Sequence, residues 1–313
     1  MKIHSYFLKA LIITSILTVM LSCNFQPKKK MLVFQNYPNL KLGLSTQDFQ
    51  LAMPLNEDNV SQIIQFASDE GFQFIEIRDV LAKLTSDECK AIARVAEKNK
   101  IDVIYVFNKN PLDTGYFKVF ERALANTLLF PGPGILRTLA AKSEFDADPL
   151  KKGWNKVEIK RLMGILDSSI AICKSKNIKF VVENFNEAFF SSDSTYMGMA
   201  DLLANEKGLL FQLDIGNLFR KTSRATPDPE MVIKYLPSLG NRWVITHLKT
   251  IQGGEPQPVL TDNPIPVEKI IPVIGQQNVQ FVMLELAAVN DKNQCFENHK
   301  ISIQFLREKG ILK

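Results

Sequence analysis

Three carboxylates and one imidazole stand at the ends of four successive apolar runs in this chain of 313 residues. They are Glu183 in KFVVE, Asp214 in LLFQLD, His247 in WVITH and Glu285 in FVMLE. The separations of 31, 33 and 38 residues each fit one strand followed by one helix. If the runs are neighbouring parallel strands, the four side chains converge as a ligand set for a divalent cation. A single acid at a strand end is as easily neutralised by a nearby lysine or arginine, but three acids and one histidine on four successive strands favour a shared cation.

The runs belong to a regular alternation of strand-like and helical segments. The predicted strands are Leu40–Ser45, Phe72–Ile77, Asp102–Phe107, Ile135–Leu139, Lys179–Glu183, Leu210–Asp214, Trp243–His247 and Gln280–Leu286. Helical periodicity is clearest over Asn59–Glu70, Asp87–Asn99 and Val157–Ser175. Eight strand–helix units with almost wholly apolar strands predict a single α/β domain over residues 39–313, a (β/α)8 TIM barrel. An open doubly wound sheet is the alternative, but Gly43 stands alone where that fold usually has a glycine-rich phosphate loop.

The bulk composition fits one globular domain and narrows the function classes. The chain is 46% hydrophobic and 23% charged, which is enough for one large core. Its net charge of +5 is mild, and the lysines and arginines are spread along the helices, which argues against nucleic-acid binding. Cys89, Cys173 and Cys295 fall in predicted helices without metal-binding spacing, so we expect buried free thiols.

The N-terminal segment has the pattern of an export signal. Two lysines precede the apolar stretch Ala10–Leu21, which is too short to cross a bilayer. The small residue directly before Cys23 resembles the lipobox of bacterial lipoproteins. We therefore predict that residues 1–23 form a signal peptide, that Cys23 carries the lipid and that residues 24–38 are a polar tether. The domain would then be exported and anchored to a bacterial membrane, facing the periplasm. An uncleaved anchor helix is the alternative.

The ligand types also select the metal. Three hard carboxylates and one imidazole without a thiolate suit Mn²⁺ best, with Mg²⁺, Co²⁺ and Zn²⁺ as alternatives. The chain holds only three histidines, and His4 and His299 lie in the signal segment and the last predicted helix. We therefore expect one divalent metal ion rather than a cluster of several.

From about residue 40 onward the chain resembles the xylose isomerase-like TIM barrels. This superfamily of sugar isomerases and epimerases, including the sugar phosphate isomerase/epimerase family, also contains inosose dehydratases and endonuclease IV. The phrases FIEIR, VVENFNE, LDIGN and THLK resemble its signatures on strands two, five, six and seven. Its ketose 3-epimerases use a Glu, Asp, His, Glu metal set, and Glu183, Asp214, His247 and Glu285 match that order. The resemblance implies that Glu183 and Glu285 also act as the acid and base on opposite faces of the substrate. Endonuclease IV binds three zinc ions with many histidines, which this chain lacks.

The same resemblance suggests which residues contact the substrate. The candidates for substrate binding are Glu76, Asn184, Asn217 and Lys249. Glu76 fits an ion pair with Arg78 equally well, and Lys249 fits a contact with a carboxylate. Asn217 stands where the ketose epimerases have a substrate-binding histidine, and Gly253 stands where they have an arginine. A ketohexose substrate is therefore not favoured. On strand four, Arg137 has the place of an ion-pairing residue inside the barrel.

These observations predict a metal-dependent sugar isomerase or epimerase that removes a proton next to a carbonyl and passes through an enediolate. A lyase acting by β-elimination on an inosose or a 3-keto-glycoside uses the same proton abstraction. A non-catalytic, lipid-anchored sugar-binding protein is the third possibility. Export, and the absence of an evident arginine pair or phosphate loop, favour a small neutral carbohydrate, a non-phosphorylated sugar or keto-sugar. No pattern indicates the oligomeric state.

Overall fold

The computed structural model describes residues 31–140, 153–191, 194–221, 226–277 and 279–313. These residues belong to one compact unit, Met31–Lys313. The predicted signal peptide, Cys23 and the first part of the predicted tether lie outside the described residues. Within the described part of the chain, no helix combines the length and the apolar character needed to cross a membrane.

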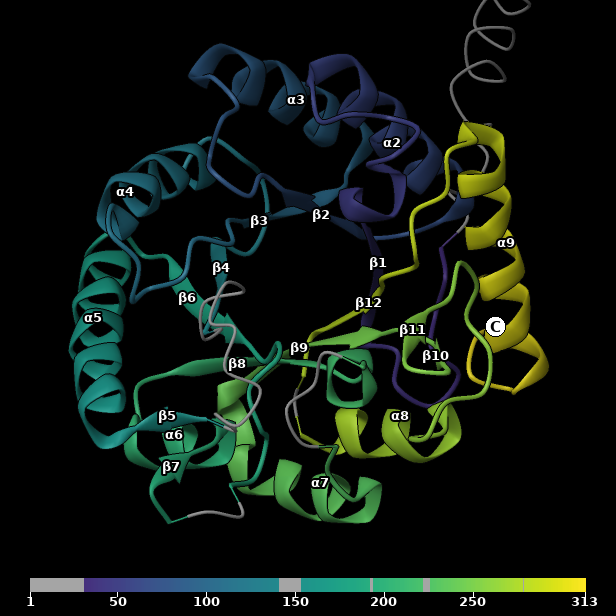
Figure 1. Ribbon diagram of the computed structural model, residues 1–313. Helices are drawn as coiled ribbons and strands as arrows, with labels where there is room; N and C mark the ends of the chain where they lie inside the picture. The colour runs from purple at the N-terminus through teal and green to yellow at the C-terminus, as the bar shows by residue number, and fades with distance from the viewer. Residues whose placement is uncertain (1–30, 141–152, 192–193, 222–225, 278) are drawn as a thin grey trace, which may run out of the picture. The chain divides into compact units, whose positions relative to one another are not determined.

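Eight parallel strands close into a barrel, which confirms the predicted (β/α)8 TIM fold (Figure 1). The strands are β1 (Lys41–Ser45), β2 (Phe74–Arg78), β3 (Asp102–Val106), β4 (Ile135–Leu139), β6 (Lys179–Glu183), β8 (Leu210–Asp214), β9 (Trp243–Leu248) and β12 (Phe281–Leu284). Their order around the barrel is β1-β12-β9-β8-β6-β4-β3-β2, so β6, β8, β9 and β12 are consecutive neighbours. The four polar strand ends are therefore brought side by side.

Helices follow the strands and cover the outside of the barrel (Figure 1). They are α2 (Glu57–Glu70), α3 (Ser86–Asn99), α4 (Tyr116–Thr127), α5 (Lys156–Ser175), α6 (Met199–Asn205), α7 (Pro229–Tyr235), α8 (Val267–Gln276) and α9 (Lys292–Glu308). The sequence fixes several of their ends. Thr85 and Glu88 form a reciprocal capping box at the start of α3, and Gly71, at φ 93°, ends α2 in a conformation that favours glycine.

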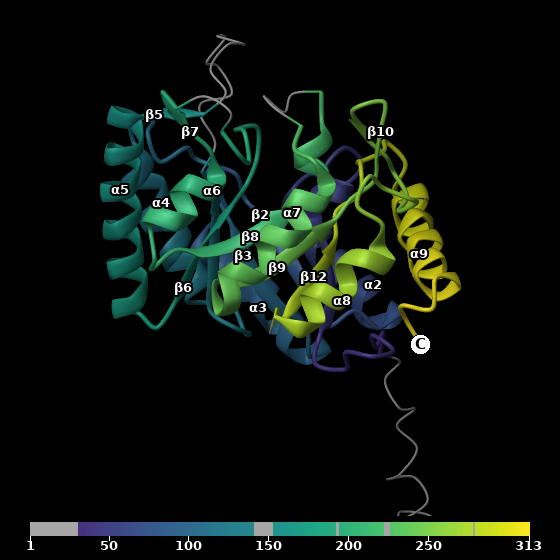
Figure 2. The ribbon, with the colours of Figure 1, turned by 90° about the horizontal axis from the view of Figure 1, so that it is seen from below.

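Short elements connect the strands to the helices. The 3-10 helices are η1 (Thr46–Phe49), η2 (Gly216–Phe219) and η3 (Leu236–Arg242). Two small antiparallel pairs join β5 (Trp154–Asn155) to β7 (Tyr196–Met197) and β10 (Ile251–Gln252) to β11 (Glu255–Pro256). Figure 2 shows β5, β7 and β10 at one end of the barrel, with the C-terminus toward the other. Because β5, β7 and β10 follow the carboxyl ends of barrel strands, they surround the mouth.

The interior of the barrel changes from apolar to polar along the strands. One buried apolar cluster inside it includes Phe74, Ile104, Ile135, Val181, Ile245, Phe281 and Met283. Alternation along a strand gives residues two apart the same face. The next inward positions after these apolar residues are polar in five strands or strand ends: Glu76, Arg137, Glu183, His247 and Glu285. The apolar layer thus closes the lower barrel and the polar layer lies at its mouth.

The predicted elements agree with the structure apart from small shifts at their ends. Phe72 was expected in the second strand, but its N–H donates to the Ala67 carbonyl and completes the end of α2. Glu285 was expected within the last strand, but it lies directly after β12, where its N–H donates to Leu248 O at 3.1 Å. The three helical cysteines are buried and free, as predicted.

Candidate metal centre

The four residues predicted to bind metal meet at the carboxyl ends of neighbouring strands. Glu183 and Asp214 are the last residues of β6 and β8, His247 lies one residue before the end of β9, and Glu285 follows β12. All four residues are buried, with at most 4% of the surface of each exposed. One ligand atom from each lies within 4.8 Å of the others. The grouping inferred from sequence spacing is therefore present in the folded chain.

The imidazole of His247 is oriented toward the carboxylates. Its Nδ1 lies 3.4 Å from Glu183 Oε1, 3.7 Å from Asp214 Oδ2 and 2.5 Å from Glu285 Oε2. Its Nε2 faces the other way, 2.6 Å from the side-chain amide nitrogen of Gln212. A carboxylate oxygen on β2 lies 3.5 Å from Nε2. That carboxylate can accept a proton on Nε2, which would leave the Nδ1 lone pair for a cation.

Two buried cations share the acidic residues between them. Lys249 Nζ lies 2.7 Å from Asp214 Oδ2 and 2.5 Å from Glu285 Oε1. Arg137 forms ion pairs with Glu183 and with Glu76, the latter at 2.8 Å. The pairing predicted for Arg137 inside the barrel is confirmed, and Lys249 makes the carboxylate contact that was one of its two readings.

The alternative partner expected for Glu76 was wrong. Arg78 lies two residues further along β2, which places it about 7 Å closer to the mouth. Glu76 remains one layer deeper, where Arg137 reaches it from β4. The substrate contact suggested for Glu76 stays a prediction, because its carboxylate is fully buried below the mouth.

The charge balance of this cluster fits a divalent cation. The four carboxylates of Glu76, Glu183, Asp214 and Glu285 carry −4, and Arg137 and Lys249 supply +2. With a neutral imidazole the buried group is left with −2. Buried like charges this close are costly unless protons or a cation offset them. A single divalent ion among three carboxylates and one imidazole would neutralise the cluster, and the donor atoms suit Mn²⁺ or Mg²⁺.

Without a cation, the cluster holds protons unequally. Burial raises the pKa of Glu183 to about 8, and the neighbouring carboxylates Asp214 and Glu285 add to the rise. Burial would also raise the pKa of Glu285, but Lys249 and His247 hold it well below its usual range. Burial would lower the pKa of His247, but Glu285 and Glu183 raise it well above its usual value. Without a cation, Glu183 is therefore the carboxylate of the four-residue cluster that binds a proton most readily.

Two asparagines tie the strand ends together. Asn184 Nδ2 donates to the Asp214 carbonyl at 3.0 Å, and Asp214 N–H donates back to Asn184 Oδ1 at 2.9 Å. Asn217 Nδ2 donates to the Asn184 carbonyl at 3.0 Å, and Asn217 N–H donates to Asp214 Oδ1 at 3.0 Å. Among the residues that the structure describes, Asn217 Oδ1 has no hydrogen-bond partner, and Asn217 lines the cavity above the cluster. Substrate binding by Asn184 and Asn217 remains a prediction, with Asn217 better placed for it.

A cavity of about 240 Å³ opens above the cluster at the barrel mouth. Its lining residues are Gln47, Gln50, Arg78, Asn108, Arg137, Leu139, Glu183, Phe185, Asn217, Arg220, Lys249 and Glu285. Sequence reasoning did not predict Gln47 as a site residue, but its Nε2 donates to Glu285 Oε1 at 3.0 Å. It also missed Arg220, which only the course of the chain after η2 brings to the mouth. Both follow strand ends, which is the one general signal that could have pointed to them.

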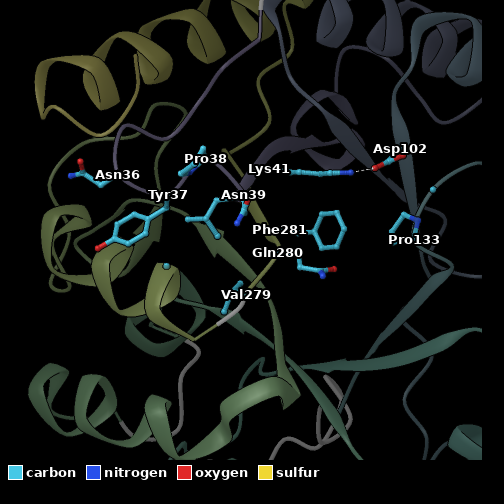
Figure 3. Close-up of a pocket in the computed structure, with 13 residues that line it drawn as sticks. Asn36, Tyr37, Pro38, Asn39, Lys41, Asp102, Pro133, Val279, Gln280 and Phe281 are labelled. Carbon is cyan, nitrogen blue, oxygen red and sulfur yellow. Dashed lines mark hydrogen bonds and ion pairs between the residues drawn. The ribbon is translucent and has the colours of Figure 1, made fainter.

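A larger cavity of about 900 Å³ lies at the opposite end of the barrel (Figure 3). It is lined at the starts of strands by Lys41, Asp102 and Phe281, with Tyr37 and Pro38 beside them (Figure 3). Lys41 and Asp102 form an ion pair at 2.5 Å across it. The cation-binding cluster is not at this end, and in barrels of this kind the lower face serves stability. Catalytic chemistry is therefore expected at the smaller, upper cavity.

Comparison with known proteins identifies the fold. No family model and no curated protein matches the chain. Among solved structures, a D-psicose 3-epimerase in the presence of D-fructose is 14% identical with a TM-score of 0.62, covering 86% of this chain and 99% of the other. A xylose isomerase-like TIM barrel protein from Mycobacterium smegmatis in complex with magnesium is 13% identical with a TM-score of 0.63, covering 86% and 97%.

A third similar structure is a 3-keto-D-glucoside 4-epimerase from E. coli, 16% identical with a TM-score of 0.60, covering 86% of this chain and 99% of the other. At these identities the likeness shows the (β/α)8 TIM barrel fold alone. The buried Glu, Asp, His, Glu group is an observation on this chain itself.

Proposed function

We propose that this protein is a metal-dependent sugar isomerase or epimerase acting on a non-phosphorylated sugar or keto-sugar. The observation that carries the proposal is the buried group of Glu183, Asp214, His247 and Glu285 beneath a cavity at the barrel mouth. Structural neighbours that are named as epimerases of D-psicose and of 3-keto-D-glucoside support the class of reaction. The substrate is left open by that support.

Within this site, two glutamates have the positions needed to move a proton. Glu183 and Glu285 belong to strand ends separated by β8 and β9, so they reach the cavity from different sides. A divalent cation held by the four residues would supply Lewis-acid polarisation of the substrate carbonyl. One glutamate then removes the proton next to the carbonyl, and the other returns a proton to the opposite face. Arg137 forms an ion pair with Glu183, and Lys249 forms one with Glu285, so both carboxylates are held in place.

Either glutamate can serve as the base, because a cation that displaces the proton of Glu183 leaves both carboxylates ionised. If a hydroxyl or alkoxide leaves after the first step instead, the reaction becomes a β-elimination, the second candidate. The likeness to a 3-keto-glucoside epimerase makes a 3-keto-glycoside a reasonable substrate for either outcome.

The proposal is tested by incubating the Mn²⁺-loaded protein with ketoses, inososes and 3-keto-glycosides in D₂O. Deuterium at the carbon next to the carbonyl, detected by NMR, is expected for the substrate. Glu183→Gln should slow the exchange by roughly 10²–10⁴-fold, because it removes a proton-transfer group while keeping the side-chain shape. The matched control is Glu255→Gln at the exposed start of β11. Absence of exchange and of elimination across the panel would instead favour a sugar-binding protein.

We further propose that Cys23 is lipidated and that the domain is anchored to a bacterial membrane, facing the periplasm. The support is the sequence pattern alone, an apolar segment followed by a small residue and Cys23. Export would also agree with a non-phosphorylated substrate. Metabolic labelling with a radioactive fatty acid should mark the wild-type chain and not the Cys23→Ala variant. Labelling of both would refute the assignment.

A further inference from the structure

Two arginines lie at the barrel mouth. Arg78 is the last residue of β2, and Arg220 follows η2; both line the cavity of about 240 Å³ above the metal centre. Each is only partly exposed. In the part of the chain that the structure describes, neither guanidinium group takes part in an ion pair or a hydrogen bond to an acid.

The acids and bases next to these arginines are already engaged. The Asp79 carboxylate accepts from Lys83 N–H at 2.8 Å, from Leu84 N–H at 2.7 Å and from the Tyr105 hydroxyl at 2.7 Å. It is therefore directed away from Arg78. Lys221, the residue after Arg220, pairs with Glu255 at 3.3 Å.

The remaining cations of the cavity are also neutralised. Arg137 and Lys249 each contact two carboxylates of the buried cluster. With a divalent cation bound, the cluster below is neutral, so the two mouth arginines add a positive charge of two that it does not balance. Arg220 additionally lies 5.7 Å from the centre of the Phe185 ring, a contact that holds a guanidinium group without neutralising it.

We propose that Arg78 and Arg220 bind an anionic group of the substrate, a carboxylate or a phosphate, while its carbonyl end lies over the metal centre. This inference rests on the proposed function and names the substrate class: a sugar acid or another oxyanion-bearing sugar rather than a neutral one. Guanidinium groups present paired N–H donors that match both carboxylate and phosphate oxygens. Since we propose a non-phosphorylated substrate, the sugar acid is the form expected.

The test compares three ligands that differ only at carbon six: D-fructose, D-fructuronate and D-fructose 6-phosphate. Their binding to the Mn²⁺-loaded protein is measured by calorimetry, which requires no turnover. D-fructuronate is expected to bind about tenfold to a hundredfold more tightly than D-fructose. Arg78→Gln and Arg220→Gln should each remove most of that advantage and leave the affinity for D-fructose unchanged.

Two further variants keep the test decisive. Arg94→Gln, on the exposed face of α3, is the matched control and should keep the full advantage. Arg78→Lys keeps the charge but loses the paired donors, so it should retain part of the affinity advantage for D-fructuronate. This variant replaces Arg78→Gln in the test if Arg78→Gln does not fold. Added NaCl should weaken D-fructuronate binding and leave D-fructose binding unchanged.

Each outcome decides a different statement. A preference for D-fructose 6-phosphate that the two arginine variants abolish supports the anion subsite and refutes a non-phosphorylated substrate. Failure of both anions to bind more tightly than D-fructose overturns the subsite, as does an advantage that survives both substitutions. An arginine-dependent preference without any deuterium exchange would keep the subsite and refute the proposed reaction.

Discussion

Replacement of Lys249 tests whether the buried cluster depends on charge compensation. Lys249 Nζ lies within 2.7 Å of carboxylate oxygens of both Asp214 and Glu285, and all three side chains are at most 5% exposed. The Lys249→Met variant keeps most of the side-chain volume and removes the charge. Breaking a buried ion pair on one side costs about 3–5 kcal/mol, since a buried charge is left uncompensated. For a domain of this size, that corresponds to a decrease in melting temperature of roughly 6–20 °C.

The assay is urea unfolding followed by circular dichroism, in EDTA and again in Mn²⁺. Lys269→Met is the control, because Lys269 pairs with Glu230 at the same 2.7 Å but both side chains are more than half exposed. That exposed pair should contribute no more than about 1 kcal/mol. In EDTA, Lys249→Met is therefore expected to be several kcal/mol less stable than Lys269→Met. Equal stability of the two variants would refute the assignment of Lys249 as a charge-compensating residue.

The metal arm of the same experiment tests the cation site. Without Lys249 the cluster carries one more negative charge, so it attracts a divalent cation more strongly. Mn²⁺ at a hundred times its dissociation constant adds about 2.7 kcal/mol to the free energy of unfolding. The stabilisation by Mn²⁺ is expected to be larger in Lys249→Met than in the wild type. If Mn²⁺ stabilises neither protein, the metal centre itself is refuted.

Two further predictions concern protons and packing. A cation must displace one proton from Glu183, whose pKa without metal is about 8, and one from His247, whose pKa is raised. The apparent affinity for Mn²⁺ should therefore fall as the pH decreases below about 8, by roughly tenfold per pH unit for each proton released. Titration calorimetry in two buffers of different ionisation enthalpy measures this proton release. An affinity for Mn²⁺ that does not change between pH 6 and pH 8 would contradict the prediction. A Cβ atom at Gly43 would lie 2.6 Å from a phenylalanine ring inside the barrel, so Gly43→Ala should cost about 1–3 kcal/mol in thermal unfolding. Gly164→Ala in α5 meets nothing within 4 Å and should stabilise by up to about 1 kcal/mol, and the opposite order of the two variants would refute the packing argument.

The sequence was sufficient to predict the fold and to group the four residues that could bind a metal ion. Eight apolar runs separated by helical periodicity predict a barrel, because strands buried on both faces need apolar residues throughout and parallel neighbours need a crossover connection, which a helix supplies. A polar residue at the end of such a run then has one place to go, the mouth. This is why Glu183, Asp214, His247 and Glu285 could be grouped before any coordinates.

The tertiary structure alone decided the partners of these residues. Arg78 stands two positions from Glu76 in sequence, yet Arg137, 61 positions away, forms the ion pair. Local spacing fixes the face of a strand that a side chain occupies, but the layer it reaches depends on the stagger between strands. Contacts across the barrel therefore have no signature in a single strand.

The same limit applies to the mouth. Arg220 reaches the cavity because η2 turns the chain back over the strand ends, and Gln47 reaches Glu285 from the opposite end of the chain. Loop residues carry no periodicity, so their convergence is a property of the closed barrel. The sequence determined which four side chains meet at the strand ends and could hold a cation. Only the closure of the barrel decided which charges surround them, and hence that Arg78 and Arg220, which pair with no acid among the described residues, line the cavity above.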